Sequence, residues 1–200
     1  MSFNATTVGK YVSAGKTNIV DGIVNHLDDI KEFLSEDIEI MCHFFAHMKV
    51  ESSNFRTLEE NLNYSASRLV QVWPRRFPSI SAATPYSHNP QKLANKVYGG
   101  RLGNTEPNDG WEFRGSGLLQ ITGRYNVEKL ADILDVEPEE CADMIRNPDT
   151  ALKCAAATYH MLGADKFTDI SRSTKAVNGG LNGLSDRKIA YSQAKRLFEA

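Results

Sequence analysis

Two glutamates, Glu51 and Glu60, are the residues of this chain whose types and spacing best suit acid–base chemistry. Glu51 follows a run of apolar residues at helical spacing and falls on the same helix face as that run. The run consists of Ile40, Met41, Phe44, Phe45 and Met48. An apolar face and the negative end of a helix both favour a protonated carboxyl group, which a general acid requires. Taken alone, Glu51 is more simply explained as a solvent-facing residue where a helix frays.

A second glutamate, Glu60, lies nine residues after Glu51 and favours a catalytic role for Glu51 over a solvent-facing one. On one continuous helix it would sit on the opposite side and roughly 13 Å further along the axis. The polar residues 52–54 can instead end the helix, so that a reversing loop brings Glu60 to face Glu51 across a groove. Two facing carboxyl groups, one buried and one hydrated, are the apparatus of glycoside hydrolysis.

A second informative stretch combines turn-forming glycines with neutral polar side chains. Gly115 and Gly117 allow sharp turns, and Gln120, Thr122 and Asn126 offer hydrogen-bonding groups without charge. Such groups suit a polyol or an acetamido sugar better than a phosphate. No strand precedes the glycines, so the stretch is not a dinucleotide fingerprint. A structural turn that leads into a helix is the alternative reading.

The third stretch is the loop from Asn178 to Gly183, with Arg187 shortly after it. Its glycines end one helix and the next begins near Asp186. By itself this pattern indicates only a connection between two helices.

Together these stretches resemble glycoside hydrolase family 19, and most closely its branch of bacteriophage endolysins and bacterial chitinase-like lysozymes. The resemblance covers the chain from about Asp37 onward. It rests on residues 55–66, Trp73-Pro74, residues 97–101, residues 110–126 and Asn178-Gly179-Gly180. It implies a mainly α, lysozyme-like α+β fold with two helical lobes around a substrate groove.

The resemblance also implies a role for each catalytic residue. Glu51 would be the general acid, Glu60 the general base that activates a water, and Thr122 a residue that holds this water. The family's mechanism is inverting, in agreement with two carboxyl groups separated by roughly 6.5–9.5 Å. This chain departs from the pattern in having Val50 before the acid and no glycines at 52–54.

The sugar-binding positions implied by the resemblance are Gln120, Tyr125, Asn126 and Asn178, with Arg187 supporting the catalytic carboxylates by its charge. We expect the substrate to be the glycan strands of peptidoglycan, cleaved at β-1,4 bonds between N-acetylated sugars. Two alternatives remain: a chitinase, and a protein that binds peptidoglycan without cleaving it.

The helical pattern predicts one catalytic domain over residues 1–200, with an N-terminal helix at about 18–34 and a catalytic core at about 37–200. Ser35 is the predicted cap of the helix that carries Glu51. No period-2 run is convincing, so at most a small hairpin near Glu60 is expected. Residues 78–88 are predicted to form an irregular loop. The other predicted helices are 65–72, 89–99, 125–134, 138–146, 148–162, 167–177 and 186–199. Ser65, Asn89 and Ser185 are the predicted caps of the first, the second and the last of these.

Net charge and hydropathy argue against two kinds of binding partner, nucleic acids and membranes. A net charge of −2 gives no reason to expect a nucleic acid, and the N-terminus lacks a long apolar run, so neither a signal peptide nor membrane insertion is expected. We expect a monomer made in the host cytoplasm that acts on the wall in the periplasm, reaching it through a separate holin-type pore.

The cysteines, Cys42, Cys141 and Cys154, are expected to be reduced thiols, or one bridge and one free thiol.

A zinc site is the main rival to metal-free hydrolysis. His43, His47 and Glu51 are each four residues apart on one helix, a spacing that can converge on zinc. The zincin pattern, however, has its glutamate directly after the first histidine, where this chain has Phe44. We therefore expect neither a metal nor another cofactor.

Overall fold

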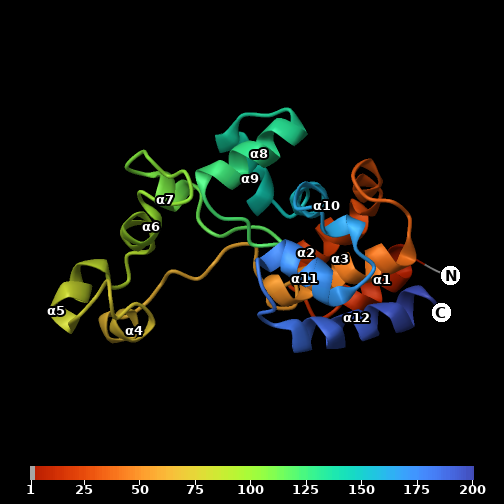
Figure 1. Cartoon of the computed structure of the whole chain (residues 1–200), viewed down its shortest axis with the longest axis horizontal. Coiled ribbons are helices and arrows are strands. Elements are labelled where there is room, and N and C mark those ends of the chain that lie inside the picture. The colour runs from red at the N-terminus through yellow and green to blue at the C-terminus, as the bar shows by residue number, and fades with distance from the viewer. Residues whose placement is uncertain (1–2) are drawn as a thin grey trace.

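The computed structural model describes residues 3–200, and helices dominate it (Figure 1). Its only strand-like pairings are isolated antiparallel bridges from Ser116 to Glu59 and to Ile121, within the described residues. The predicted mainly α fold class is therefore confirmed. The α-helices are α1 (Ala5–Val12), α2 (Thr17–Asn25), α3 (Ile38–Glu51), α4 (Ala66–Val72), α5 (Ile80–Ala83), α6 (Pro90–Tyr98), α7 (Asp109–Glu112), α8 (Arg124–Leu134), α9 (Pro138–Arg146), α10 (Ala151–Met161), α11 (Ile170–Asn178) and α12 (Leu184–Phe198). The 3-10 helices are η1 (Leu27–Glu32), η2 (Thr84–Tyr86) and η3 (Ala164–Lys166).

Helices α1–α3 and α10–α12 form one body, which we call the larger body, and α3 lies at its centre. Every residue from Ile40 to Met48 is buried, because α10, α11 and α12 pack against the helix and Tyr11 of α1 packs on Phe45. Being covered on nearly all sides explains why its apolar residues are not confined to one stripe. Helix α12 packs along α3 and brings the C-terminal part of the chain beside Glu51 (Figure 1).

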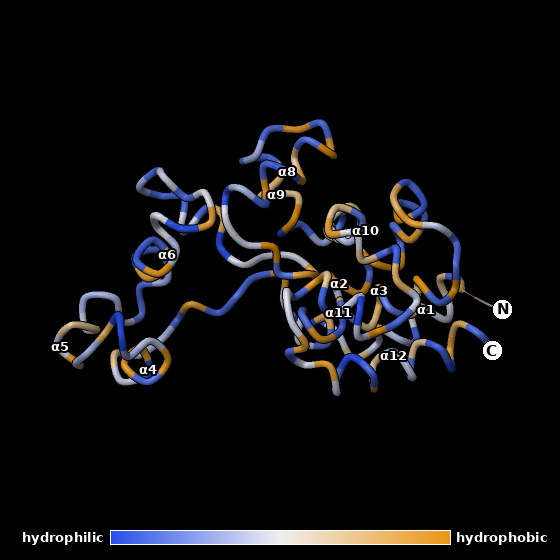
Figure 2. The backbone as a smooth tube through the Cα atoms, in the orientation of Figure 1, coloured by the Kyte–Doolittle hydropathy of each residue, from blue (hydrophilic) through white to orange (hydrophobic). Residues whose placement is uncertain are grey.

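A second body, formed by α4 to α7, lies apart from α1–α3 and α10–α12 (Figure 1). It has an apolar core of its own, which includes Leu69, Phe77 and Leu93, and its apolar residues are visible in Figure 2. Two chain segments connect the bodies. We call residues 58–62 the first link and residues 113–122 the second link. They are held together by hydrogen bonds such as Gly117 N–H to the Leu58 carbonyl, 2.6 Å.

Local signals located several helix boundaries correctly. Ser65 and Asn89 cap α4 and α6 through their side chains, and α9 spans the predicted residues 138–146. The three cysteines are free and buried. No helix in the described part of the chain is long and apolar enough to cross a bilayer.

Other boundaries were predicted wrongly. The predicted helix 18–34 is broken at His26 into α2 and η1, and α1 was not predicted at all. Asp37, not Ser35, caps α3, by accepting a hydrogen bond from the Glu39 N–H at 2.8 Å.

Two further predictions were wrong: the loop at residues 78–88 and the cap of the last helix. Residues 78–88 form the short helices α5 and η2 instead of an irregular loop. Ser185 lies inside α12, because Gly183 takes the N-cap position in the left-handed conformation, with φ 69°. A glycine there turns the chain more sharply than serine would allow.

Two helical glycines make a matched test of the packing of the N-terminal helices. A Cβ on Gly22 would overlap the carbonyl group of Pro148, whereas a Cβ on Gly9 would meet only the Val24 side chain, at 3.7 Å. Alanine is favoured over glycine in an open helix by about 1 kcal/mol. We expect Gly9→Ala to raise the free energy of unfolding by up to about 1 kcal/mol and Gly22→Ala to lower it, measured by urea unfolding. Equal effects would contradict this packing of α2 on Pro148, in the segment that precedes α10.

Candidate active site

Glu51 is the last residue of α3, and its carboxylate is bonded to Arg187 from α12. The Nη2 group of Arg187 donates to Glu51 Oε1. The side chain of Glu51 is 23% exposed, whereas that of Arg187 is 3% exposed. The predicted apolar surroundings of Glu51 are therefore wrong, because α12 brings a guanidinium group to the face where the helix pattern placed only apolar neighbours.

The chain leaves α3 through an unusual turn. Ser53, Asn54 and Phe55 all have positive φ angles, of 53°, 65° and 60°. Non-glycine residues in this region cost roughly 1–3 kcal/mol each, so the surrounding structure must hold them. Ser52 contributes by accepting from the Phe55 N–H at 2.9 Å and donating to the Met48 carbonyl at 2.6 Å, and Phe55 is fully buried.

Arg187 has two further acceptors besides Glu51. Its Nη1 group donates to His47 Nδ1 at 2.8 Å, and its Nε group donates to the Asn182 carbonyl at 3.4 Å. That same carbonyl accepts from Asn178 Nδ2 at 3.1 Å. The loop before α12 is thereby fastened to the residue that holds Glu51.

His47 is fully buried beneath this guanidinium. Because arginine only donates, His47 Nδ1 must be the accepting nitrogen, and the Nε2 N–H then donates to Ser173 Oγ at 2.7 Å. Burial, the charge of Arg187 and, to a lesser degree, His43 lower the pKa of His47 to about 3. His47 is therefore neutral at physiological pH.

Glu60 lies in the first link and is held from two directions. The Gly115 N–H donates to Glu60 Oε1 at 2.6 Å, and the Tyr98 hydroxyl donates to Oε2 at 2.7 Å. The backbone N–H of Glu60 donates to the Gly115 carbonyl at 2.9 Å. Burial and the neighbouring Glu60 carboxylate raise the pKa of Tyr98, so the phenol keeps the proton that it donates.

Thr122 lies beside Glu60. A Cβ on Gly115 would stand 3.1 Å from Glu60 Oε1 and 3.2 Å from Thr122 Oγ1, so only glycine leaves both oxygens in place. Thr122 Oγ1 donates to the Gln120 carbonyl at 3.1 Å, and Asn126 Nδ2 donates to the Thr122 carbonyl at 2.8 Å.

Gln120 and Tyr125 are the remaining predicted residues near Glu60 and Thr122. Gln120 has a φ of 52°, and its Nε2 group donates to the Gly117 carbonyl at 2.9 Å. Tyr125 is 54% exposed, with the Lys129 ammonium 4.2 Å from the centre of its ring.

Glu59, the neighbour of Glu60, has a different partner. Its carboxylate accepts from both the Nε and Nη2 groups of Arg114, whose guanidinium lies 3.8 Å from the Trp111 ring centre. The charge of Glu59 is thus neutralised by an arginine, whereas Glu60 accepts from an amide and a phenol.

The eight residues predicted for the site fall into two groups. Glu51, Arg187 and Asn178 gather where α3 meets α12, and Glu60, Thr122, Gln120, Asn126 and Tyr125 gather around the second link. Sequence reasoning missed Tyr98 and the contact between His47 and Arg187. Tyr98 lies in a motif that carried the family resemblance, but its partner is 38 residues away.

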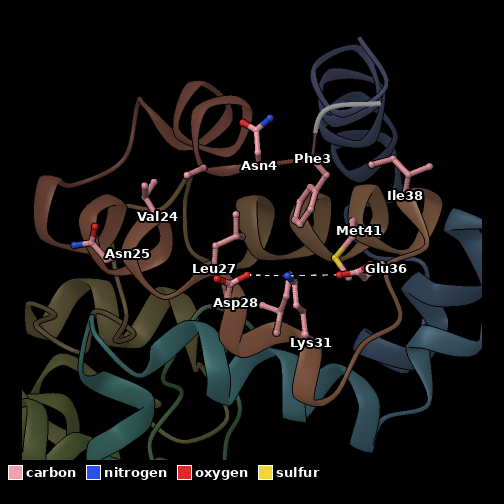
Figure 3. Close-up of a pocket in the computed structure, with 12 residues that line it drawn as sticks. Phe3, Asn4, Val24, Asn25, Leu27, Asp28, Lys31, Glu36, Ile38 and Met41 are labelled. Atoms are coloured by element: carbon pink, nitrogen blue, oxygen red, sulfur yellow. Dashed lines mark ion pairs between the residues drawn. The ribbon is translucent and has the colours of Figure 1, made fainter.

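The histidines proposed for zinc have other contacts. His43 hydrogen-bonds through Nδ1 to the Phe167 carbonyl at 3.3 Å, and His47 lies between Arg187 and Ser173. In residues 3–200 no three His, Cys, Asp or Glu side chains form a group that could hold a metal ion. A cavity of about 500 Å³ lies elsewhere, between α1, α2, η1 and the start of α3, with the Lys31 ammonium between Asp28 and Glu36 (Figure 3).

Comparison with known proteins finds a relative described as a glycosyl hydrolase family 19 domain-containing protein, from Haemophilus influenzae. It is 37% identical over 152 residues, which cover 74% of this chain and 74% of the relative. No family model matches the chain.

Among solved structures, chitinase C from Streptomyces griseus HUT6037 is similar, with a TM-score of 0.59 and 11% identity over 98% of this chain and 92% of that one. A mutant of chitinase C gives a TM-score of 0.57 at the same identity and coverage. At this level of identity the likeness shows a shared fold.

The neutral, buried His47 makes stability depend on pH. Its folded-state pKa of about 3 lies below the ordinary value near 6.5, so the unfolded chain takes up a proton that the folded chain refuses. We expect the free energy of unfolding to fall as the pH drops from about 6.5 toward 3, by up to about 1.4 kcal/mol per pH unit from this group. Urea unfolding of the unmutated protein and of His47→Asn at pH 8, 6, 5 and 4 measures it. The variant should show the shallower slope below pH 6.5, and equal slopes would contradict the assignment.

Proposed function

The chain belongs to glycosyl hydrolase family 19 and is a glycosidase, and from this premise we propose that it hydrolyses β-1,4 bonds between the N-acetylated sugars of bacterial peptidoglycan. The observation that carries the proposal is the setting of Glu60, a carboxylate held by two uncharged donors beside a threonine hydroxyl, as a base that activates water requires. Glu51 is the second carboxylate of the proposal, and it is held in place at the end of α3 by Arg187.

In this mechanism Glu51 is the general acid. Arg187 binds its Oε1 atom, so the proton for the glycosidic oxygen is carried by Oε2. Proton donation to the leaving oxygen is the step that this group contributes, typically worth 10²- to 10⁴-fold in rate.

Glu60 is the general base of the proposal. Gly115 and Tyr98 fix the orientation of its carboxylate, and Thr122 supplies a hydroxyl close enough to hold the same water. Glu59 is unsuited to this role, because its carboxylate is already paired with Arg114. The water would attack the sugar from the face opposite the acid, with inversion.

Three amide side chains offer acceptors for the substrate. Gln120, Asn126 and Asn178 each use their amide nitrogen to bind a backbone carbonyl. Their amide oxygens are thereby oriented, and we assign these oxygens to the hydroxyl and acetamido N–H groups of the sugar. The exposed ring of Tyr125 would stack on a sugar face.

We extend the proposal to the biological role of a bacteriophage endolysin. The resemblance to that branch of the family supports it. On this proposal the enzyme is made as a monomer in the host cytoplasm, and a separate holin-type pore admits it to the wall.

Chitin is the competing substrate, because the similar solved structures are chitinases and chitin has the same linkage between N-acetylated sugars. Clearing of outer-membrane-permeabilised Gram-negative cells is compared with release of reducing sugar from colloidal chitin at equal enzyme concentration. We expect the cells to clear at the higher rate. Turnover of chitin alone would refute the peptidoglycan proposal.

Substitution of each glutamate tests the catalytic assignment. We expect Glu51→Gln and Glu60→Gln to lower turnover by about 10²- to 10⁴-fold while sedimentation with peptidoglycan is retained. Glu59→Gln is the matched control at the neighbouring carboxylate, and it should retain most activity in molecules shown to be folded. If Glu59→Gln removed activity and Glu60→Gln did not, the base would be Glu59. If the unmutated protein bound peptidoglycan and released no sugar, it would be a binding protein.

A further inference from the structure

We infer that His47 is a positioning residue for the proposed reaction: it holds the Arg187 guanidinium in the orientation in which Arg187 binds Glu51. The inference rests on the proposed function of Glu51. The contacts run in one line, from Ser173 to His47 to Arg187 to Glu51, across three helices.

The Arg187 guanidinium has little freedom to change its partners. Arg187 is 2% exposed, so its N–H groups depend on protein acceptors. Nη2 binds Glu51, Nη1 binds His47, and the Nε contact with Asn182 is long, at 3.4 Å. Removing the acceptor at His47 would leave a buried, charged donor without a partner and turn the guanidinium away from its present plane.

The imidazole is held in one tautomer and one orientation. Arg187 can only donate, so Nδ1 carries the lone pair, and the Nε2 N–H donates to Ser173 on α11, which holds the ring from its other side. A neutral imidazole can accept from Arg187 without competing with Glu51 for its charge. A carboxylate at this position would compete in that way.

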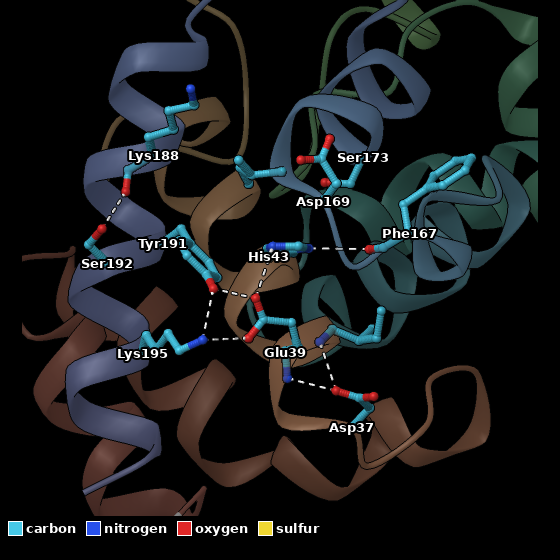
Figure 4. Close-up of polar contacts among 12 residues, drawn as sticks. Asp37, Glu39, His43, Phe167, Asp169, Ser173, Lys188, Tyr191, Ser192 and Lys195 are labelled. Carbon is cyan, nitrogen blue, oxygen red and sulfur yellow. Dashed lines mark hydrogen bonds and ion pairs between the residues drawn. The ribbon is translucent and has the colours of Figure 1, made fainter.

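Helix α12 is also attached to α3 at a second place, away from His47. A second polar cluster, shown in Figure 4, joins the two helices nearer the start of α3. Tyr191 donates to Glu39, Lys195 Nζ binds Glu39 Oε2 at 3.0 Å, and the Tyr191 ring lies 4.8 Å from that of His43. We expect this cluster to retain α12 when His47 is replaced, and to confine the change to the direction of the Arg187 side chain.

The experiment compares two replacements of His47. Asparagine places an oxygen near the position of Nδ1 and keeps an acceptor for Arg187, whereas leucine fills similar space without one. His43→Asn and His43→Leu are the matched controls, because His43 is a buried histidine one turn earlier on α3 that contacts Tyr191 and Phe167. Turnover on peptidoglycan is measured per folded molecule, with kcat and KM separated.

We expect His47→Leu to lower kcat by about 10- to 100-fold, the scale on which a misplaced catalytic group acts, with KM changed less than about threefold. His47→Asn should recover most of that loss. The His43 pair should change thermal stability and leave kcat within about threefold. An equal loss of kcat in His47→Asn and His47→Leu, or no loss in either, would overturn the inference.

A second measurement does not depend on turnover. The ¹⁵Nε–Hε resonance of Arg187, assigned by its loss in Arg187→Lys, should shift in His47→Leu and return toward its original position in His47→Asn. If the unmutated protein proves inactive on both polysaccharides, the proposed function fails, and the resonance still decides whether His47 sets the guanidinium. An unchanged resonance in His47→Leu overturns the inference.

Discussion

The bond between Arg187 and Glu51 is the interaction on which the rest of the site depends. A buried guanidinium needs a negative partner, and the end of α3 supplies one. To bring the two together, α12 must run along α3, and α3 must end at Glu51. The turn at residues 53–55 meets the second requirement with three residues in an unfavourable conformation, stabilised by the burial of Phe55.

The other carboxylate is controlled in a different way. Glu60 is not paired with an arginine but is bonded to a backbone N–H and to a phenol, and the segment opposite it contains a glycine that no larger residue could replace without displacing Glu60 or Thr122. The two carboxylates thus have unlike partners, a guanidinium for Glu51 and an uncharged amide and phenol for Glu60.

Sequence reasoning succeeded where the determining interaction is local. Ser65 and Asn89 cap their helices through contacts within three residues. The apolar run at 40–48 correctly predicted a helix with a buried face, although α3 is buried on nearly all sides. It failed where two local signals compete. Ser35 and Asp37 are both good caps, and Asp37 prevails although nothing in their spacing decides between them.

In the candidate site, too, the sequence predicted the residues themselves better than the contacts between distant parts of the chain. The candidate residues, Arg187 among them, came from the spacing of Glu51 and Glu60 and from a family resemblance, but the other neighbours that contact them did not. His47 meets Arg187 across 140 residues, and Tyr98 meets Glu60 across 38. Such pairs are set by how helices pack, which a single sequence does not report. The apolar surroundings expected for Glu51 failed for this reason, since a helix pattern describes one helix and not the one beside it.

The pairing of the two links has a mechanical consequence. The first link crosses from Leu58, in the core of the larger body, to Leu62, in the core of the smaller one, and Glu60 lies midway. Glu60 is hydrogen-bonded to Gly115 in the second link. The two links are therefore joined to each other, and Glu60 and Thr122 lie in the same hydrogen-bonded unit. A hinge motion between the bodies would therefore move Glu60 and Thr122 relative to Glu51 as one unit, with the spacing within that pair unchanged.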